Sequence, residues 1–313
     1  MVFVLGFDNG YSPFADATIA SVCVNNAGEH LFYVITDYLS DDNRKKLERD
    51  VKCYGSSIEY IFVNENDIKD FPLGPHMANN YVSIATYFRL FMIDKLPEKV
   101  QKVIYLDCDV IVNGSLSLIW NWKFKDGHCI LAANDEPKNA GLSTRRLGYD
   151  YTYSYFNAGV LMVDLVKLRK VLDKNIINSY IRQHINIIKF HDQDILNALL
   201  FDKRDVMPVE YNMLEVYYMK GQYLDINGNE LLSKLRNPIV IHYSGPIKPW
   251  HTECKHPLKD VFFQYICKTN FSAFVPSRKY NNLKLKSMYV AKQVVKFFLE
   301  FFHVRFYSYI DFL

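Results

Sequence analysis

Residues 103–109 read Val-Ile-Tyr-Leu-Asp-Cys-Asp, an apolar run that ends in two carboxylates. The run predicts a buried strand, because unbroken apolar residues are typical of a strand covered on both faces. Open α/β sheets bind ligands just beyond the carboxyl ends of their strands. Asp107 and Asp109 are therefore placed to hold a hard divalent cation against phosphate oxygens. A solvated loop is the alternative, because Asp-x-Asp also arises by chance.

Around this stretch, strand-like and helix-like segments alternate along the chain. Strands are expected at residues 2–7, 31–36, 58–63, 102–106, 129–133, 159–163 and 238–243. Helices are expected at 13–26 and 41–55, capped by Ser12 and Ser40, and at 86–96, 164–188 and 193–201. The alternation predicts a mostly parallel mixed sheet with helices on both faces. Residues 204–237 are rich in Asn, Gly and Tyr and show no clear periodicity, so the sequence does not assign their secondary structure.

The composition is that of a globular protein with a basic end. Of the 313 residues, 50% are hydrophobic and 23% charged, which supplies a sizeable core and excludes wholesale disorder. Seven basic and two acidic side chains fall in residues 276–313, so the rest of the chain is close to neutral. A near-neutral body argues against nucleic-acid binding.

The start of the chain and the pattern of its cysteines lead us to expect a cytoplasmic protein. No Lys or Arg precedes Arg44, so the basic start of a secretory signal is missing. No uncharged apolar stretch reaches the roughly 18 residues of a membrane span. The six cysteines form no C-x-x-C pair, as expected for reduced thiols rather than for a disulfide framework or a zinc site.

A second motif, at residues 242–251, reads HYSGPIKPWH and follows another predicted strand. The imidazole of His242 beside two carboxylates would complete a mixed nitrogen and oxygen site, which suits Mn²⁺ better than Mg²⁺. Lys248, presented by a turn rich in Gly and Pro, would bring positive charge to a phosphate. The alternative is a rigid turn in which His242 belongs to the core.

Two further motifs place polar groups next to predicted elements. Asn157 precedes two small residues and a buried strand, and its amide could bind a sugar hydroxyl. Asp192 and Gln193 open a helix, where acidic residues are also ordinary capping groups. A plain turn and plain capping are the respective alternatives. The chain has no G-x-G-x-x-G, Walker-type or G-x-S-x-G motif, so redox, P-loop and α/β-hydrolase chemistry lose support.

Taken in order, these motifs resemble those of the family 8 retaining glycosyltransferases. The resemblance covers about residues 1–270 and rests on FDNGY at 7–11, TYFRL at 86–90, YLDCDVIV at 105–112, YFNAGVLMVDL at 155–165, HDQDILN at 191–197 and HYSGPIKPWH at 242–251. It looks most like the bacterial galactosyl- and glucosyltransferases that build lipopolysaccharide outer cores. It implies one nucleotide-sugar-binding α/β domain, Rossmann-like and of GT-A type, over residues 1–275.

The resemblance also implies roles for the motif residues. Asp8 and Tyr11 would hold the uracil of a UDP-hexose, with glucose and galactose not distinguished, and Gly245 and Lys248 would contact its phosphates. The implied ligands of Mn²⁺, or alternatively of Mg²⁺, are Asp107, Asp109 and His242. The residues implied around the transferred hexose are Arg89, Asp135, Asn157, Asp192 and Gln193.

Gln193 stands where a double displacement would need a carboxylate nucleophile. A neutral amide is a poor nucleophile, so we expect front-face transfer in which a UDP phosphate oxygen helps to deprotonate the acceptor hydroxyl. Two positions depart from the family pattern: the nucleotide loop reads Asp8-Asn9-Gly10 rather than Asp-Asp-Asn, and Tyr81 replaces a His expected against the acceptor. We expect a saccharide acceptor on a lipid, such as lipopolysaccharide or a similar surface glycan.

Residues 276–313 form a predicted C-terminal tail that is helical, basic and aromatic. On a helical wheel Lys292, Lys296, Glu300 and His303 share one face, while apolar side chains crowd the rest. Such a segment is typical of an interfacial membrane anchor, so we expect a peripheral protein on the inner face of the cell membrane. A helix packed on the body or on another subunit is the alternative.

Two other functions stay open at this point. A glycogenin-like protein that glucosylates itself would share the fold, although no linker that presents a Tyr toward the site is evident. A catalytically silent, membrane-anchored saccharide-binding protein belongs to a different class, and the complete acid–acid–His set argues against it.

Overall fold

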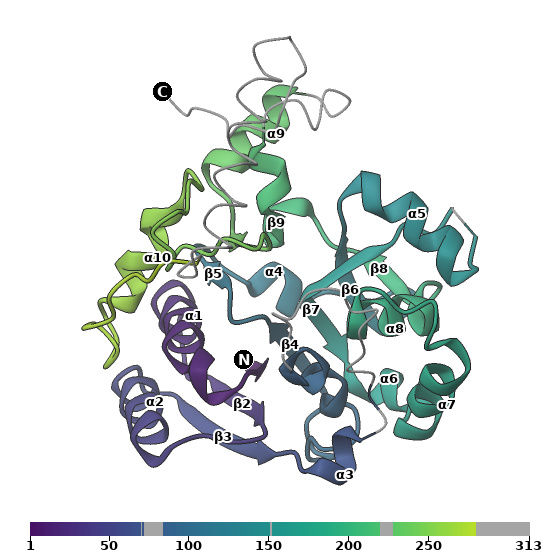
Figure 1. Cartoon of the computed structure of the whole chain (residues 1–313), viewed down its shortest axis with the longest axis horizontal. Coiled ribbons are helices and arrows are strands. Elements are labelled where there is room, and N and C mark those ends of the chain that lie inside the picture. Colours follow the sequence, from purple (N-terminus) through teal and green to yellow (C-terminus); the bar gives the residue numbers. More distant parts are fainter. Residues whose placement is uncertain (70, 72–83, 151, 220–227, 280–313) are drawn as a thin grey trace.

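A seven-stranded sheet forms the centre of the structure (Figure 1). Its strands in spatial order are β3 (Ser57–Phe62), β2 (Leu31–Thr36), β1 (Val2–Gly6), β4 (Lys102–Leu106), β7 (Phe156–Asp164), β6 (Ile130–Asn134) and β8 (Arg204–Val206). β7 alone runs against its neighbours β4 and β6, whereas the other adjacent pairs are parallel. This confirms the predicted mostly parallel mixed sheet. The computed structural model describes residues 1–69, 71, 84–150, 152–219 and 228–279.

A smaller sheet joins distant parts of the chain. It consists of β5 (Val110–Val112), β10 (Val240–His242) and β9 (Met213–Leu214). β10 lies antiparallel to β5, with His242 opposite Val110, and parallel to β9. Because β5 begins directly after Asp109, this register brings the second strand-end motif beside the first.

The helices cover both faces of the large sheet, as predicted. On one face lie α1 (Ser12–Asn25), α2 (Asp41–Cys53) and α4 (Ser117–Trp120). On the other lie the 3-10 helix η2 (Ile84–Met92), α6 (Leu165–Val171), α7 (Lys174–His184) and α8 (His191–Leu200). The remaining helical segments are η1 (Asn9–Tyr11), α3 (Glu65–Ile68), α5 (Pro137–Leu147), η3 (Val209–Tyr211), η4 (Glu215–Tyr218), α9 (Gly228–Arg236) and α10 (Lys259–Ile266).

The alternation of side chains along β1 shows how the two faces are filled. Phe3 and Leu5 join the core beneath α1 and α2, whereas Val4 joins the core beneath η2, α6 and α8. A strand that is apolar on both faces must be covered on both, which is why the unbroken apolar runs of the sequence become central strands.

The start of α1 differs from the sequence prediction. Ser12 lies inside the helix instead of capping it, and its hydroxyl donates to the backbone oxygen of Asn9 at 2.9 Å. The capping side chain is Asp8, which accepts from the backbone N–H of Gly10 and starts the short turn η1 ahead of α1. The predicted cap at Ser40 is confirmed, since its hydroxyl accepts from the backbone N–H of Asn43.

Two predicted helices also differ from the structure. The segment expected as one helix over 164–188 is two, because α6 ends at Val171 and the side chain of Asp173 caps a new helix, α7. The segment expected at 86–96 is a 3-10 helix that ends at Met92. Tyr81 and the tail residues 280–313 lie outside the described residues.

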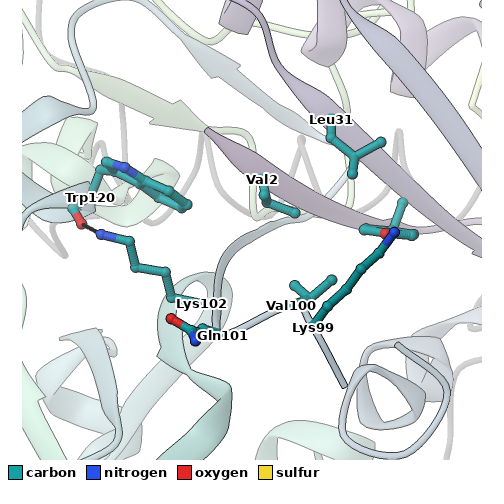
Figure 2. A pocket seen from close by; sticks show the side chains of 8 residues that line it. Val2, Leu31, Lys99, Val100, Gln101, Lys102 and Trp120 are labelled. Carbon is teal, nitrogen blue, oxygen red and sulfur yellow. Dashed lines mark hydrogen bonds between the residues drawn. The ribbon is translucent and has the colours of Figure 1, made fainter. Parts of the chain in front are cut away.

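A cavity of about 310 Å³ opens at the amino ends of the parallel strands (Figure 2). It is lined by Val2, Leu31, Tyr33, Lys99, Val100, Gln101, Lys102 and Trp120. Lys102 donates from Nζ to the backbone oxygen of Trp120 at 2.9 Å across it. The cavity is at the opposite edge of the sheet from Asp107, and none of the candidate site residues lines it.

The first residues after the predicted domain boundary are joined to the body. Ser277 pairs with the segment at His251, donating to the backbone oxygen of Trp250 and accepting from the N–H of Thr252. No helix among the described residues is both long and apolar enough to cross a membrane. The boundary at 275 and the membrane-associating tail stay predictions.

Candidate active site

Three side chains from two separated parts of the chain converge at the carboxyl end of β4. Asp107 follows β4, Asp109 precedes β5 and His242 ends β10. One ligand atom from each lies within 4.8 Å of the other two. Backbone bonds hold them there, since Asp107 N–H donates to Gly159 at 2.8 Å and Tyr243 N–H donates to Asp109 at 3.0 Å.

Gly159 makes this convergence possible. A Cβ atom at this position would lie 2.3 Å from Cε1 of His242 and 2.8 Å from Oδ2 of Asp107. No side chain fits within such distances, so only glycine allows the imidazole and the carboxylate to lie against β7. The small residues after Asn157 were expected to let another group come close to the backbone. In the structure, the side chains of His242 and Asp107 lie close to the backbone of Gly159.

Lys248 lies beside the carboxylate pair. Its ammonium contacts Asp109 Oδ2 at 2.5 Å and donates to the backbone oxygen of Tyr243 at 2.7 Å. Burial alone would raise the pKa of Asp109, but Lys248 and then His242 hold it well below its usual range. The turn that presents Lys248 is closed by His251, whose Nδ1 accepts from the backbone N–H of Lys248 at 2.9 Å.

The donor set of this centre fits a divalent cation. Oδ1 of Asp109 is buried and accepts no hydrogen bond among the described residues, although it lies 3.4 Å from Nε2 of His242. Two carboxylates and one imidazole form a mixed oxygen and nitrogen set, which Mn²⁺ accepts readily. Asp107, Asp109 and His242 are therefore the residues that would hold the metal.

Arg89 lies on the other side of Asp107, buried within the site. Its guanidinium contacts Asp107 Oδ1 at 2.9 Å and Asp192 Oδ2 at 2.5 Å, and it also donates to the backbone oxygen of Ala158. Its Cζ lies 4.7 Å from the centre of the Tyr105 ring. One guanidinium thus balances two carboxylates, and Arg89 is placed to hold acids of the site in position.

The 3-10 form of η2 explains how Asp192 is held. With three residues per turn, positions i and i+3 lie on the same side, and Thr86 and Arg89 both reach Asp192. The Thr86 hydroxyl donates to Asp192 Oδ1 at 2.6 Å. Burial nevertheless raises the pKa of Asp192 to about 6, with a smaller raising effect from the charge of Asp107, against the lowering influence of Arg89 and Thr86.

This pKa predicts how stability depends on pH. Folding raises the pKa of Asp192 from 3.8 to about 6, so between these values the folded chain binds more protons than the unfolded chain. The contribution of Asp192 is therefore complete at low pH and falls, by on the order of 3 kcal/mol, as pH rises through about 6. Urea unfolding should show wild type losing stability relative to Asp192→Asn as pH rises from 3.8 to about 6, and a constant difference between the two at higher pH. A wild type that gains stability relative to Asp192→Asn over this range would contradict the assignment.

Gln193 is fixed by hydrogen bonds at both ends of its amide. Nε2 donates to Asp135 Oδ2 at 2.9 Å, and Oε1 accepts from the backbone N–H of Ala158 at 3.0 Å. Burial raises the pKa of Asp135 above its usual range. Asn157, expected just before a strand, lies inside β7, where its Oδ1 accepts from Gly159 N–H at 2.9 Å. The structure thus gathers all five of the residues expected around the hexose, counting Arg89 and Asp192, into one hydrogen-bonded region.

Asp8 and Tyr11 stand at the carboxyl end of β1, the neighbour of β4. Tyr11 is partly exposed and packs edge-on against Phe14 and Trp250. Burial raises the pKa of the Tyr11 hydroxyl above its usual range, and the charge of Asp109 adds to this effect. Asn9 is turned toward α2 instead, where its Oδ1 accepts from the N–H of Ser40 at 2.8 Å. Asn9, which stands where the family pattern has a second Asp, therefore holds the start of α2 in this chain.

Two buried residues of the site were missed from the sequence. Asn212 contacts both His242 and Asn157, and Glu215 packs so closely on Gly245 that a Cβ there would lie 1.5 Å from Oε2 of Glu215. The phosphate contact of Gly245 stays a prediction, and a side chain at this position would displace the carboxylate of Glu215. Both missed residues fall in 204–237, where no periodicity revealed an element.

Comparisons with known proteins agree with this geometry. The family model described as Glycosyl transferase family 8 matches residues 2–254. A lipopolysaccharide 1,2-glucosyltransferase of Escherichia coli is 27% identical over 82% of this chain and 75% of its own length. General stress protein A of Bacillus subtilis is 27% identical over 85% of this chain and 92% of its own.

Solved structures give the same result. The crystal structure of the galactosyltransferase LgtC, in complex with donor and acceptor sugar analogues, superposes with a TM-score of 0.76. It is 27% identical in sequence and matches 86% of this chain and 96% of its own. The family match over residues 2–254 includes both sheets and the acid–acid–His centre, and the chain belongs to glycosyl transferase family 8, whose members are retaining glycosyltransferases.

Proposed function

We propose that the protein transfers glucose or galactose from a UDP-sugar to a saccharide carried on a lipid, in a Mn²⁺-dependent reaction. Relatives named as a lipopolysaccharide 1,2-glucosyltransferase and a lipopolysaccharide 1,3-galactosyltransferase support this acceptor class. The observation that carries the proposal is the convergence of Asp107, Asp109 and His242 at one point. That point lies at the carboxyl end of β4, next to β1, where the strand order of the sheet changes direction, and open α/β sheets bind ligands at such switch points.

The residues around this point divide between the two halves of the donor. Asp8 and Tyr11, at the end of β1, would hold the uracil by a hydrogen bond and by ring stacking. Lys248 and the turn at Gly245 would meet the diphosphate. Asp192 and Gln193, held by Arg89 and Asp135, would face the hexose together with Asn157.

The proposed chemistry depends on charge that develops during bond cleavage. Breaking the anomeric bond leaves negative charge on UDP, and bound Mn²⁺ would supply positive charge against it. Lys248 adds a second positive charge beside Asp109, within the same water-poor region. Asp192 would lie on the sugar side, where its carboxylate would stabilise positive charge at the anomeric carbon.

The bonds made by Gln193 favour front-face transfer. A double displacement needs a nucleophile free to attack the anomeric carbon. Gln193 is a neutral amide whose oxygen already accepts from Ala158 N–H. We therefore propose attack by the acceptor hydroxyl on the face that UDP leaves, with a UDP phosphate oxygen taking the proton. Mass spectrometry that detected a hexosyl adduct on Gln193 or Asp192 would contradict this mechanism.

A donor screen tests the proposed activity. UDP release from UDP-glucose, UDP-galactose and UDP-N-acetylglucosamine is measured with Mn²⁺, with Mg²⁺ and with a chelator. We expect release from one UDP-hexose with Mn²⁺, and loss of release when the metal is removed. The intact mass of the enzyme after the incubation separates transfer from self-glucosylation, which would add hexose units to the chain. Release that is indifferent to chelation would contradict the metal proposal.

We also propose that the basic tail holds the enzyme at the inner face of the cell membrane. Because Ser277 and Lys279 bond to the body, the matched shortened chain should end after Lys279. Full-length protein should sediment with phosphatidylglycerol vesicles at low salt and leave them at high salt, since about 1 kcal/mol per basic residue is expected near an anionic surface. Equal sedimentation of both chains would rule out the anchor.

A further inference from the structure

A buried row of amides ends at the imidazole of the candidate metal centre. Asn212 is fully buried and lies between Asn157 and His242. Its Nδ2 lies 2.9 Å from Asn157 Oδ1, and its Oδ1 lies 2.8 Å from Nδ1 of His242. At the other end of the row, Asn157 Oδ1 lies 2.9 Å from the backbone nitrogen of Gly159.

The Gly159 end of this row has a polarity that cannot be reversed. A backbone N–H only donates, so the atom of Asn157 that faces Gly159 must be its oxygen. The same oxygen faces Asn212, which must therefore present its NH₂ group. This leaves the oxygen of Asn212 facing His242. Because an amide oxygen only accepts, Nδ1 of His242 must carry the proton.

The opposite ring nitrogen is then free to bind a cation. In this tautomer Nε2 presents a lone pair, and it lies 3.4 Å from Oδ1 of Asp109. In the other tautomer, Nε2–H would donate to Oδ1 of Asp109. Neither Nε2 nor that oxygen would then have a lone pair directed at a cation. The Nδ1–H form instead leaves a lone pair and a carboxylate oxygen facing each other, an arrangement that a cation between them stabilises.

We propose that Asn212 is a positioning residue, which transmits the fixed polarity of Gly159 N–H to His242 and holds the imidazole in its metal-binding tautomer. Supporting groups of this kind typically change metal affinity by 10- to 100-fold when removed. The inference rests on the proposed function in one respect only, which is that the cation bound at His242 is Mn²⁺. The tautomer itself is a property of the metal-free chain.

The first test reads the tautomer directly. Long-range ¹⁵N–¹H NMR spectra of histidine-labelled, metal-free protein are recorded at a pH at which the histidines are neutral. His242→Gln identifies the signal among the nine histidines of the chain. Wild type should show His242 protonated at Nδ1, and Asn212→Leu should lose this preference. Asn157→Leu, which removes the fixed end of the row, should weaken it. A wild-type spectrum with the proton on Nε2 would overturn the proposal.

The second test measures Mn²⁺ affinity by electron paramagnetic resonance of the free ion, without any sugar donor. Asn212→Leu should weaken binding 10- to 100-fold. Asn212→Asp keeps an acceptor oxygen toward Nδ1 but loses the NH₂ group that faces Asn157, so its Mn²⁺ affinity should fall less than that of Asn212→Leu. The control is Asn26→Leu, at the far end of α1, where a buried amide donates to Val22 and accepts from Leu116. It should cost stability and leave Mn²⁺ affinity unchanged.

The two tests separate this inference from the proposed function. If wild type binds no Mn²⁺, the metal proposal fails, and the NMR spectra still decide whether Asn212 sets the tautomer. If Asn212→Leu keeps both the wild-type tautomer and the wild-type Mn²⁺ affinity, Asn212 has no positioning role.

Discussion

Replacement of Asp109 by Asn should lower Mn²⁺-dependent hexose transfer by about a thousandfold or more. The substitution keeps the shape of the side chain and removes the charge that faces Lys248 at 2.5 Å and His242 at 3.4 Å. A cation bound there loses one of its two carboxylates, and the electrostatic stabilisation of the departing UDP is lost with it. Initial rates of UDP release and of product formation, measured at saturating Mn²⁺, report the effect.

The control for this substitution is an acid that takes no part in the site. Asp42, in the first turn of α2, is exposed and pairs with Lys46, so Asp42→Asn should leave transfer unchanged. Slow hydrolysis of the donor in the absence of an acceptor should fall together with transfer in Asp109→Asn. Unchanged turnover in that variant would refute the assignment of the metal site.

Replacement of Arg89 by Met should lower the free energy of unfolding by about 3–5 kcal/mol. The guanidinium is the cation between Asp107 and Asp192, and its side chain is only 8% exposed. Without it, two largely buried carboxylates face each other with no cation between them. Urea unfolding at neutral pH measures the loss, and transfer should fall as well because both acids lose their positions.

Two further variants test that reason. Arg89→Met combined with Asp192→Asn removes one of the two charges, so it should recover part of the lost stability without recovering transfer. Arg182→Met, on the exposed side of α7, should change stability by no more than about 0.5 kcal/mol. If the double variant is no more stable than Arg89→Met alone, repulsion between the two acids is not the cause.

Much of the sheet could be predicted because its strands are marked by local sequence. The predicted strands at 31–36 and 102–106 match β2 and β4, since apolar side chains on both faces leave few alternatives to burial in a sheet. Asp107 could be placed for a related reason, because the carboxyl ends of parallel strands share one edge. Errors arose where polar side chains compete locally. Ser12 has a capping side chain by type, yet Asp8 caps the turn ahead of it.

The sequence by itself determined the α/β architecture and the edge at which the acids stand, because strand hydrophobicity and strand ends are properties of neighbouring residues. Only the tertiary structure decided that His242 faces Asp109, since the pairing of β5 with β10 joins segments about 130 residues apart. The roles of Asn212 and Glu215 could not be predicted from the sequence for the same reason. Their segment has no periodicity, and their importance comes from the partners that the fold brings to them, His242 and Gly245. Contacts between distant segments form because they lower the free energy of the whole folded chain. A pattern among neighbouring residues in the sequence cannot predict them.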